Sequence, residues 1–342
     1  MRALIVSSVL ITTIFAPIQS ALAMDRAKLM DAFFSVVMIR GYNATGGLAY
    51  GSGVVVSKDK VITNCHVLRA TKQPWVSRGE DTYPITSVKV DAWHDLCLVS
   101  TYGLPFKAAV IGKSTDLKRG QEVAAIGHSS GSPAPITSRG SVKGLYDSDH
   151  GKIIRSGAKF LLGASGSGLF TMNGELVGIN TFKTSGHGGS IHYALPVEWV
   201  GQLEKQAEVT SFPISGKALW EEDEDKKPFY MQVAVPESRQ DWPKLAEVAE
   251  KWTQAEPKNT EAWFELGLAQ EKMGKVDLAE QAYKQAFELD STNFDALLHL
   301  GILAKNKGDQ KEMRRIHLAL VDLNEDVAAE YVEMIDCTTN CR

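Results

Sequence analysis

Short apolar runs separated by Gly-rich turns occupy residues 28–200. The runs are rich in Val and Ile, and no long segment with a 3.6-residue apolar period lies between them. This pattern is typical of a β-sandwich or β-barrel rather than of alternating strands and helices. A helix is predicted from Pro196 to about Ala207. Strands are predicted at Val36–Ile39, Gly53–Val56, Val61–Thr63, Leu96–Val99, Val123–Ile126 and Leu176–Ile179.

The apolar period becomes helical from Trp242 onward, and the pattern then repeats. Two 34-residue units cover residues 260–293 and 294–327. Equivalent positions hold Trp263 and Leu297, Leu266 and Leu300, and Gly267 and Gly301. This period and spacing resemble the tetratricopeptide repeat, a helical hairpin that stacks on its neighbours. Residues 245–257 resemble the second helix of a degenerate unit, and a helix at 327–335 is predicted to cap the stack.

Residues 208–241 join the two regions and follow neither pattern. The acidic run at 221–225 is flanked by Pro213, Pro228 and Pro236, which favours a solvated linker. The predicted organisation is therefore a β-rich domain at residues 28–207, a linker at 208–241 and an all-α repeat region at 242–336.

The composition is that of a globular protein, with 342 residues, 44% hydrophobic and 23% charged. It excludes a wholly disordered or collagen-like chain. Residues 1–200 contain 20 Lys and Arg against 13 Asp and Glu, a net charge of +7, whereas the remainder has 17 against 28, or −11. Such asymmetry indicates two modules with separate surfaces. Neither half is basic enough to indicate a nucleic-acid partner.

The N-terminal residues have the features of a secretory signal peptide. Arg2 precedes an apolar stretch that Pro17 ends, and Ala21–Ala23 offers an A-x-A cleavage site. The stretch is shorter than the roughly 20 apolar residues that a membrane span needs. We therefore predict cleavage of residues 1–23 and a periplasmic or secreted mature chain without a membrane span. In an oxidising compartment the even number of cysteines, 4, favours disulfides.

Three segments of the β-rich region carry the residue types of a hydrolytic site. His66 follows the predicted strand at 61–63, Asp95 directly precedes the strand at 96–99, and Ser165 lies in a Gly-rich turn. A Ser nucleophile needs an imidazole to accept its proton, and the imidazole needs a carboxylate to orient it. The chain order His, Asp, Ser is the one found in chymotrypsin-type peptidases.

Four segments resemble motifs of the chymotrypsin-like peptidases, in particular of their bacterial Deg-type and glutamyl-endopeptidase-like branches. These segments are Gly51–Val55, Thr63–Val67, Asp95–Leu98 and Gly163–Ser167. The resemblance implies two packed β-barrels, a double barrel with the site in the cleft between them. It also implies His66 as general base, Asp95 as its orienting group and Ser165 as nucleophile. The backbone N–H groups of Gly163 and Ser165 would then form the oxyanion hole.

Each of these assignments has a competitor in the sequence. His94 and Asp91 lie beside the acid motif, but only Asp95 directly begins an apolar strand, as a buried orienting carboxylate should. Ser167 competes with Ser165, although it stands where the wider family often has Gly. A Cys2His2 metal site can also be drawn from Cys65, His66, His94 and Cys97. Neighbouring residues on a strand face opposite sides, so we predict no metal and no cofactor.

Residues 176–181 and 193–197 resemble the strands of the family's specificity pocket. By position, Asn180, Thr181 and Phe182 lie beside the pocket, and Lys183, His187 and His192 lie on or near its walls. A basic lining favours an acidic or small residue before the cleaved bond.

Two further expectations depend on the same assignments. A hydrogen-bonded His66–Asp95 pair would bring Cys65 and Cys97 within bridging range, so we predict that disulfide, and a second one between Cys337 and Cys341. Digestive members of the family order the oxyanion turn with a new N-terminal amine that pairs with an Asp before the Ser. Ala164 cannot accept that amine, so the turn must be held by contacts of its own loop.

The sequence therefore predicts an exported serine endopeptidase whose repeat region binds a peptide substrate or a protein partner. We predict that truncation after about residue 210 leaves the hydrolysis of small peptides intact but changes the binding of partners or protein substrates. The alternative is a catalytically inactive exported scaffold that recruits partners through its repeats.

Overall fold

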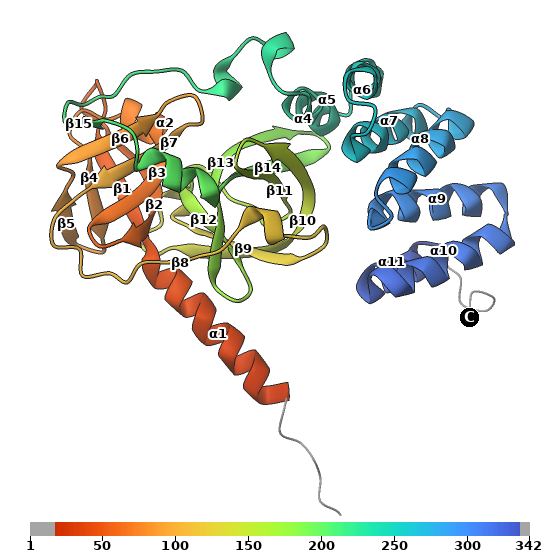
Figure 1. The fold of residues 1–342 in the computed structure, drawn as a ribbon, viewed down its shortest axis with the longest axis horizontal. Helices are drawn as coiled ribbons and strands as arrows, with labels where there is room; N and C mark the ends of the chain where they lie inside the picture. Colours follow the sequence, from red (N-terminus) through yellow and green to blue (C-terminus); the bar gives the residue numbers. More distant parts are fainter. Residues whose placement is uncertain (1–17, 336–342) are drawn as a thin grey trace, which may run out of the picture.

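The computed structural model describes residues 18–335, which form a β-rich region of two curved sheets with a helical region beside it (Figure 1). The predicted cleavage position Ala23 lies within helix α1 (Ile18–Ser35). Most of the predicted signal peptide and the predicted Cys337–Cys341 disulfide lie outside the described residues. Among the helices of residues 18–335, none combines the length and apolarity needed to cross a membrane.

The first sheet has 8 strands in the order β15-β6-β7-β3-β2-β1-β4-β5. Between β3 and β4 the chain forms one short helix, α2 (Cys65–Arg69). The strands are β1 (Val36–Tyr42), β2 (Leu48–Ser57), β3 (Lys60–Asn64), β4 (Trp75–Arg78), β5 (Asp81–Pro84), β6 (Ser87–Asp91), β7 (Leu96–Ser100) and β15 (Glu208–Val209).

The second sheet has 7 strands in the order β12-β9-β10-β11-β14-β13-β8, and an additional β12–β13 pairing closes it into a barrel. Its strands are β8 (Val110–Ile111), β9 (Glu122–Gly127), β10 (Ile136–Ser148), β11 (Gly151–Ser156), β12 (Ser167–Thr171), β13 (Glu175–Gly186) and β14 (Gly189–Pro196). Short 3-10 turns η1 (Ser114–Asp116) and η2 (Ser129–Gly131) interrupt the connections.

All six predicted strands are present, and their burial explains the continuous apolar runs. Successive side chains of a strand face opposite sides of the sheet. In β3, Val61 packs into the core of the first sheet, whereas the adjacent Ile62 packs into the cluster that continues into the second barrel. Both faces are buried here, so Val61 and Ile62 form a continuous apolar pair without alternation, although the other residues of β3 are the polar Lys60, Thr63 and Asn64.

The helix predicted up to Ala207 ends earlier than expected. The structure has a 3-10 turn, η3 (Val197–Trp199), followed by α3 (Val200–Leu203). Glu208 and Val209 pair with β6 as strand β15, so the chain must leave the helix before them.

The predicted helical repeats are present at the predicted period. Gly267 and Gly301 occupy equivalent places, and a Cβ there would lie 2.6 Å from the Tyr283 ring and 2.4 Å from the Tyr331 ring. Only glycine lets each ring pack this closely on the neighbouring helix. The helices are α6 (Trp242–Ala255), α7 (Thr260–Lys272), α8 (Val276–Leu289), α9 (Phe294–Lys307), α10 (Gln310–Leu323) and α11 (Glu325–Ile335).

The segment predicted as a solvated linker is only in part solvated. The acidic run 221–225 is mostly exposed, as expected. Its flanks form η4 (Leu219–Glu221), η5 (Glu224–Lys226), α4 (Phe229–Gln232) and α5 (Ala234–Arg239). The flanks also contribute buried side chains, namely Ile214, Ala218, Leu219, Tyr230, Met231, Val233 and Ala234. The prediction of a solvated linker is therefore wrong for these flanks, and a cut after residue 210 would remove this part of the core.

The helical region is docked on the second barrel by aromatic and charged contacts. Tyr146 of β10 stacks on Tyr230 of α4 with ring centroids 4.8 Å apart. Arg155 of β11 pairs with Glu237 at 2.6 Å and with Glu265 of α7 at 2.8 Å. One hydrophobic cluster runs from the second barrel through α4, α6 and α7 without interruption. Figure 1 shows these helices directly beside β11 and β14.

Candidate active site

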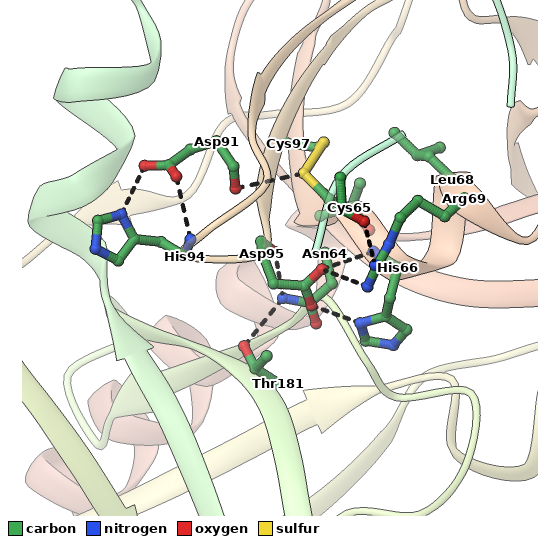
Figure 2. The surroundings of a disulfide bond; sticks show 12 residues. Asn64, Cys65, His66, Leu68, Arg69, Asp91, His94, Asp95, Cys97 and Thr181 are labelled. Carbon is green, nitrogen blue, oxygen red and sulfur yellow. Dashed lines mark hydrogen bonds and ion pairs between the residues drawn. A yellow bond between two sulfur atoms is a disulfide. The ribbon is translucent and has the colours of Figure 1, made fainter. Parts of the chain in front are cut away.

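His66 and Asp95 form a closely bonded pair at the end of β3 and the start of β7. The His66 backbone N–H donates to Asp95 Oδ1 at 2.7 Å, and the ring Nδ1 lies 2.5 Å from Oδ2 (Figure 2). Asp95 has no exposed surface, while the His66 side chain is 33% exposed. The Asp95 backbone has a φ of 55°, which is uncommon outside glycine, and its carbonyl accepts from the Cys65 N–H at 3.0 Å.

The electrostatics of this pair set the imidazole tautomer. Burial raises the pKa of Asp95, and the His66 ring and backbone donors, with Arg69 4.0 Å away, oppose that shift. An ionised Asp95 can only accept, so its contact with Nδ1 favours the tautomer with the proton on Nδ1 and the lone pair on Nε2. Figure 2 shows this second ring nitrogen facing away from Asp95. The arrangement orients His66 to accept a proton at Nε2.

The competing residues form a separate pair. His94 Nδ1 lies 2.7 Å from Asp91 Oδ2, and the His94 ring packs on Trp199 with centroids 4.0 Å apart. Although burial favours the neutral form of Asp91, hydrogen bonds from His94 hold its pKa below the ordinary value. The structure thus assigns one imidazole to each carboxylate, and Asp95 is the one that faces His66.

The Gly-rich turn around Ser165 lies against the segment that carries His66. The Ser165 carbonyl accepts from the Ser52 N–H at 2.8 Å. Gly166 has a φ of 84°, and a Cβ there would lie 2.4 Å from Thr63 Oγ1 and 2.9 Å from the Asn64 backbone nitrogen. A side chain at residue 166 would therefore push the turn off β3, which explains the glycine after Ser165.

The residues before Ser165 form a tight turn with a left-handed glycine. The Ala164 N–H donates to the Leu161 carbonyl at 3.0 Å, and Gly163 has a φ of 92°. A positive φ at the third residue defines a type II turn. The Leu162 carbonyl accepts from the Ser130 N–H at 2.6 Å. The N–H of Gly163 belongs to the same trans peptide unit, so it points away from Ser130.

Contacts that the sequence reasoning missed hold this turn. Ser52 Oγ donates to the Gly163 carbonyl at 2.8 Å, and the Leu161 N–H lies 3.3 Å from Ser129 Oγ. Ala164 itself is buried. These hydrogen bonds are the loop contacts that we expect to hold the turn in place of an N-terminal ion pair. Ser52 could have been found from the sequence, because it lies within the Gly51–Val55 motif. No sequence feature marks Ser129 or Ser130.

Asn64 and Thr181 support the pair from behind. Asn64 Nδ2 donates to the Asp95 carbonyl and to Thr181 Oγ1, both at 3.0 Å (Figure 2). Thr181 is therefore buried beneath the site. Asn180 is fully buried, and its amide donates to Ser167 Oγ and the Gly168 carbonyl, both at 2.9 Å. The Asn180 side chain is therefore held within the β12–β13 pair and offers no surface to a ligand.

The remaining predicted pocket residues differ in environment. Lys183 and His187 are exposed and Phe182 is half-buried. His192 is buried with its ring 4.7 Å from that of Phe160. Burial, together with Lys183 and Lys159, lowers the pKa of His192 to about 4. At neutral pH His192 is uncharged, so any positive charge at this wall comes from the two lysines.

The predicted Cys65–Cys97 disulfide is present, with the two Cα atoms 5.0 Å apart. Strand pairing brings it about, because Thr63 of β3 is opposite Cys97 of β7. Both sulfurs are thereby withdrawn from the alternative Cys2His2 site. Within residues 18–335 no group of three or more His, Cys, Asp and Glu side chains is placed to hold a metal ion.

Removing this disulfide is expected to destabilise the β-rich region. The bond joins residues 32 positions apart, and closing such a loop in the unfolded chain corresponds to about 3–4 kcal/mol. Chemical denaturation of the Cys65→Ala/Cys97→Ala double variant against the oxidised wild type measures the loss. Two reactive thiols at these positions in periplasmically produced protein would contradict the assignment.

Two family profiles match the chain, that of the trypsin-like peptidase domain at residues 51–179 and that of the tetratricopeptide repeat at 260–293. Serine protease HTRA1B of Danio rerio is 32% identical over 190 residues, which are 52% of this chain and 39% of that protein. A probable periplasmic serine endoprotease, DegP-like, of Chlamydia pneumoniae is 32% identical over 197 residues, 54% of this chain and 40% of that protein.

Among solved structures, the active form of the Rv3671c protease from M. tuberculosis matches with a TM-score of 0.49 and 22% identity, over 62% of this chain and 99% of that chain. The chain contains a trypsin-like peptidase domain of the HtrA/DegP type and a tetratricopeptide repeat, as the motifs predicted. It spans 39–40% of the length of the two curated relatives. The matched segment 51–179 includes His66, Asp95 and Ser165.

Proposed function

We propose that this chain is a serine endopeptidase in which His66 is the general base, Asp95 orients it and Ser165 is the nucleophile. The observation that carries the proposal is the double contact between His66 and Asp95, at 2.7 and 2.5 Å. A carboxylate is costly to bury unless charged or hydrogen-bonding groups compensate it. Here the compensating group is a partly exposed imidazole whose second nitrogen faces away from the carboxylate (Figure 2).

In the proposed reaction, His66 Nε2 accepts the Ser165 hydroxyl proton while Ser165 Oγ attacks the carbonyl carbon of a peptide bond. The tetrahedral intermediate collapses to an acyl-enzyme as His66 returns the proton to the leaving amine. A water molecule, deprotonated by His66, then attacks the ester, and His66 returns the proton to Ser165 Oγ as the acid is released. Asp95 stays ionised throughout and stabilises the imidazolium form.

The turn at residues 161–164 supports this assignment. The negative charge of the tetrahedral intermediate needs preorganised donors, and backbone N–H groups are suited to it. The hydrogen bond from Ser130 to the Leu162 carbonyl holds the Leu162–Gly163 peptide unit in one orientation. We propose that the N–H groups of Gly163 and Ser165 donate to the oxyanion.

A reactive fluorophosphonate probe tests the proposal and separates it from an inactive scaffold. We expect covalent labelling of the full chain at Ser165, located by mass spectrometry of the peptides. His66→Ala should abolish labelling, because Ser165 then lacks its base. His94→Ala is the matched control, since His94 also pairs with an Asp at 2.7 Å, and should be labelled like the wild type. A folded wild type without label at Ser165 would show that the chain is a scaffold.

We further propose that the enzyme acts after export, in the periplasm of a bacterium or outside the cell. The Cys65–Cys97 disulfide and the relative named as periplasmic support this location. The proposed substrates are peptides or proteins. We propose that the repeat region also contacts protein partners, through surfaces other than the faces of α7 and α9 that hold Arg119 and Arg155.

A further inference from the structure

Trp220, in the segment 208–241 that joins the two regions and is called the connector below, lies beside the His66 imidazole. The Trp220 and His66 rings meet edge to face, with centroids 5.9 Å apart and an interplanar angle of 89°. On its other side Trp220 stacks on Phe182 of β13 at 5.6 Å. Trp220 thus contacts both the His66 ring and β13, although it lies 154 positions after His66 in the chain.

The connector around Trp220 is fixed to the first sheet by several bonds. Arg69 Nη1 donates to the Gly216 carbonyl at 2.7 Å and to Glu221 Oε2 at 2.6 Å. The Leu219 N–H donates to the Trp93 carbonyl at 2.9 Å. Arg69 also lies 4.0 Å from Asp95, so the helix that carries His66 anchors the connector directly. Trp220 is therefore a fixed wall of the site.

Close packing at Gly216 fixes the position of the connector backbone against the first sheet. Gly216 has a φ of 124°, and a Cβ there would lie 2.3 Å from Cβ of Ala92. Ala92 belongs to the turn between β6 and Asp95. The small residues at both positions let the connector backbone lie directly on that turn, beside the His66–Asp95 pair.

Beyond Asn180, the edge of β13 that faces away from β14 has no strand partner among residues 18–335. On one side β13 pairs with β14 as far as Gly186, but on the other it pairs with β12 only up to Asn180. A peptide can add to such an unpaired edge through its main chain. With its scissile carbonyl at Ser165, the residue immediately before the cleaved residue would pass along the Trp220 ring, beside His66 and Phe182.

We propose that Trp220 determines specificity at that position, restricting the residue before the cleaved one to small side chains such as Gly and Ala. Side chains alternate in direction along an extended peptide, so this one faces the Trp220 ring when its neighbour enters the main pocket. A bulky side chain would meet the ring, which Phe182 and the Arg69 contacts prevent from moving. The inference rests on the proposed function, because it concerns substrate binding at the proposed site.

Peptides that differ only in the residue before the cleaved one test this inference. For the wild type we expect kcat/KM to fall at least about tenfold from Ala to Phe at that position, a typical discrimination by pocket size. In Trp220→Ala the difference should shrink or reverse, and Trp220→Phe should restore part of it. An equal rise for all peptides would show that Trp220 is a plug, and an equal fall would show that it only positions His66; either result overturns the inference.

A second variant displaces the Trp220 ring without replacing the tryptophan. Gly216→Ala places a methyl group against Ala92 and should displace the connector, with the same loss of discrimination. Gly103→Ala is the matched control, because Gly103 also has a positive φ, 74°, but has open space around it. Probe labelling at Ser165 distinguishes a failure of the proposed function from a failure of the inference about Trp220. An unlabelled wild type contradicts the proposed function, whereas labelled variants with the wild-type preference contradict only the role of Trp220.

Discussion

Replacing Ser165 with Ala should abolish peptide hydrolysis and leave the fold intact. Without the nucleophile no acyl-enzyme can form, and removal of a catalytic serine lowers kcat by about 10⁶-fold in comparable triads. The Ser165 side chain is only partly buried, so its hydroxyl carries little of the folding free energy. The measurement is kcat on a peptide substrate together with the thermal unfolding midpoint.

Ser167→Ala is the control for this experiment, since Ser167 is the competing serine of the same turn. Ser167 Oγ accepts from Asn180 Nδ2 at 2.9 Å and is fully buried. Losing that bond should cost about 1 kcal/mol of stability and leave hydrolysis in place. If Ser167→Ala were the inactive variant and Ser165→Ala the active one, the assignment of the nucleophile would be wrong.

Truncation after residue 210 should leave a protein that neither folds nor hydrolyses peptides. The cut removes Ile214, Leu219, Tyr230, Met231 and Val233, which are all buried. At about 1.5–3 kcal/mol for each large apolar side chain, their loss amounts to about 8–15 kcal/mol, as much as the whole stability of a typical domain. The cut also removes Trp220 and Glu221 from beside His66. Near-ultraviolet circular dichroism and probe labelling measure the outcome.

A chain that ends after residue 293 provides the comparison. It keeps the hydrophobic cluster shared by the second barrel, α4, α6 and α7, and loses only α9 to α11. We expect this shorter chain to fold and to hydrolyse small peptides. A well-folded, active protein ending at residue 210 would instead support the modular organisation that the acidic run suggested.

Local patterns in the sequence identified most elements of the fold. The central residues of buried strands such as β3 and β7 face apolar side chains on both sides of the sheet, which makes them visible as continuous apolar runs. The repeat was visible because Gly267 and Gly301 recur at the 34-residue period, each in a place where a tyrosine ring packs on the helix. Boundaries were less predictable. The helix after Pro196 ends at Leu203 because the chain must reach β6, a requirement that its own residues do not record.

The candidate site was predictable in its chemistry but not in its surroundings. The motifs around His66, Asp95 and Ser165 are short, and their residue types are dictated by proton transfer, so spacing and order were sufficient to propose them. Which carboxylate faces which imidazole depended on the turn at Asp95, whose positive φ aims both carboxylate oxygens at His66. The two hydrogen bonds that the Asn180 amide donates likewise depend on the pairing of β12 with β13.

The sequence by itself determined the central Val- and Ile-rich strands, the helical period, the three motifs and the pairing of Cys65 with Cys97, because each leaves a local pattern or follows from adjacent motifs. Only the tertiary structure decided the place of the connector. Its acidic run looks the same whether the chain is free or anchored. The bond from Arg69 to Glu221 joins residues 152 positions apart, and the packing of Trp220 on His66 is similarly distant. Such contacts have no periodicity and no fixed spacing, so they emerge only when the folded sheets bring the segments together.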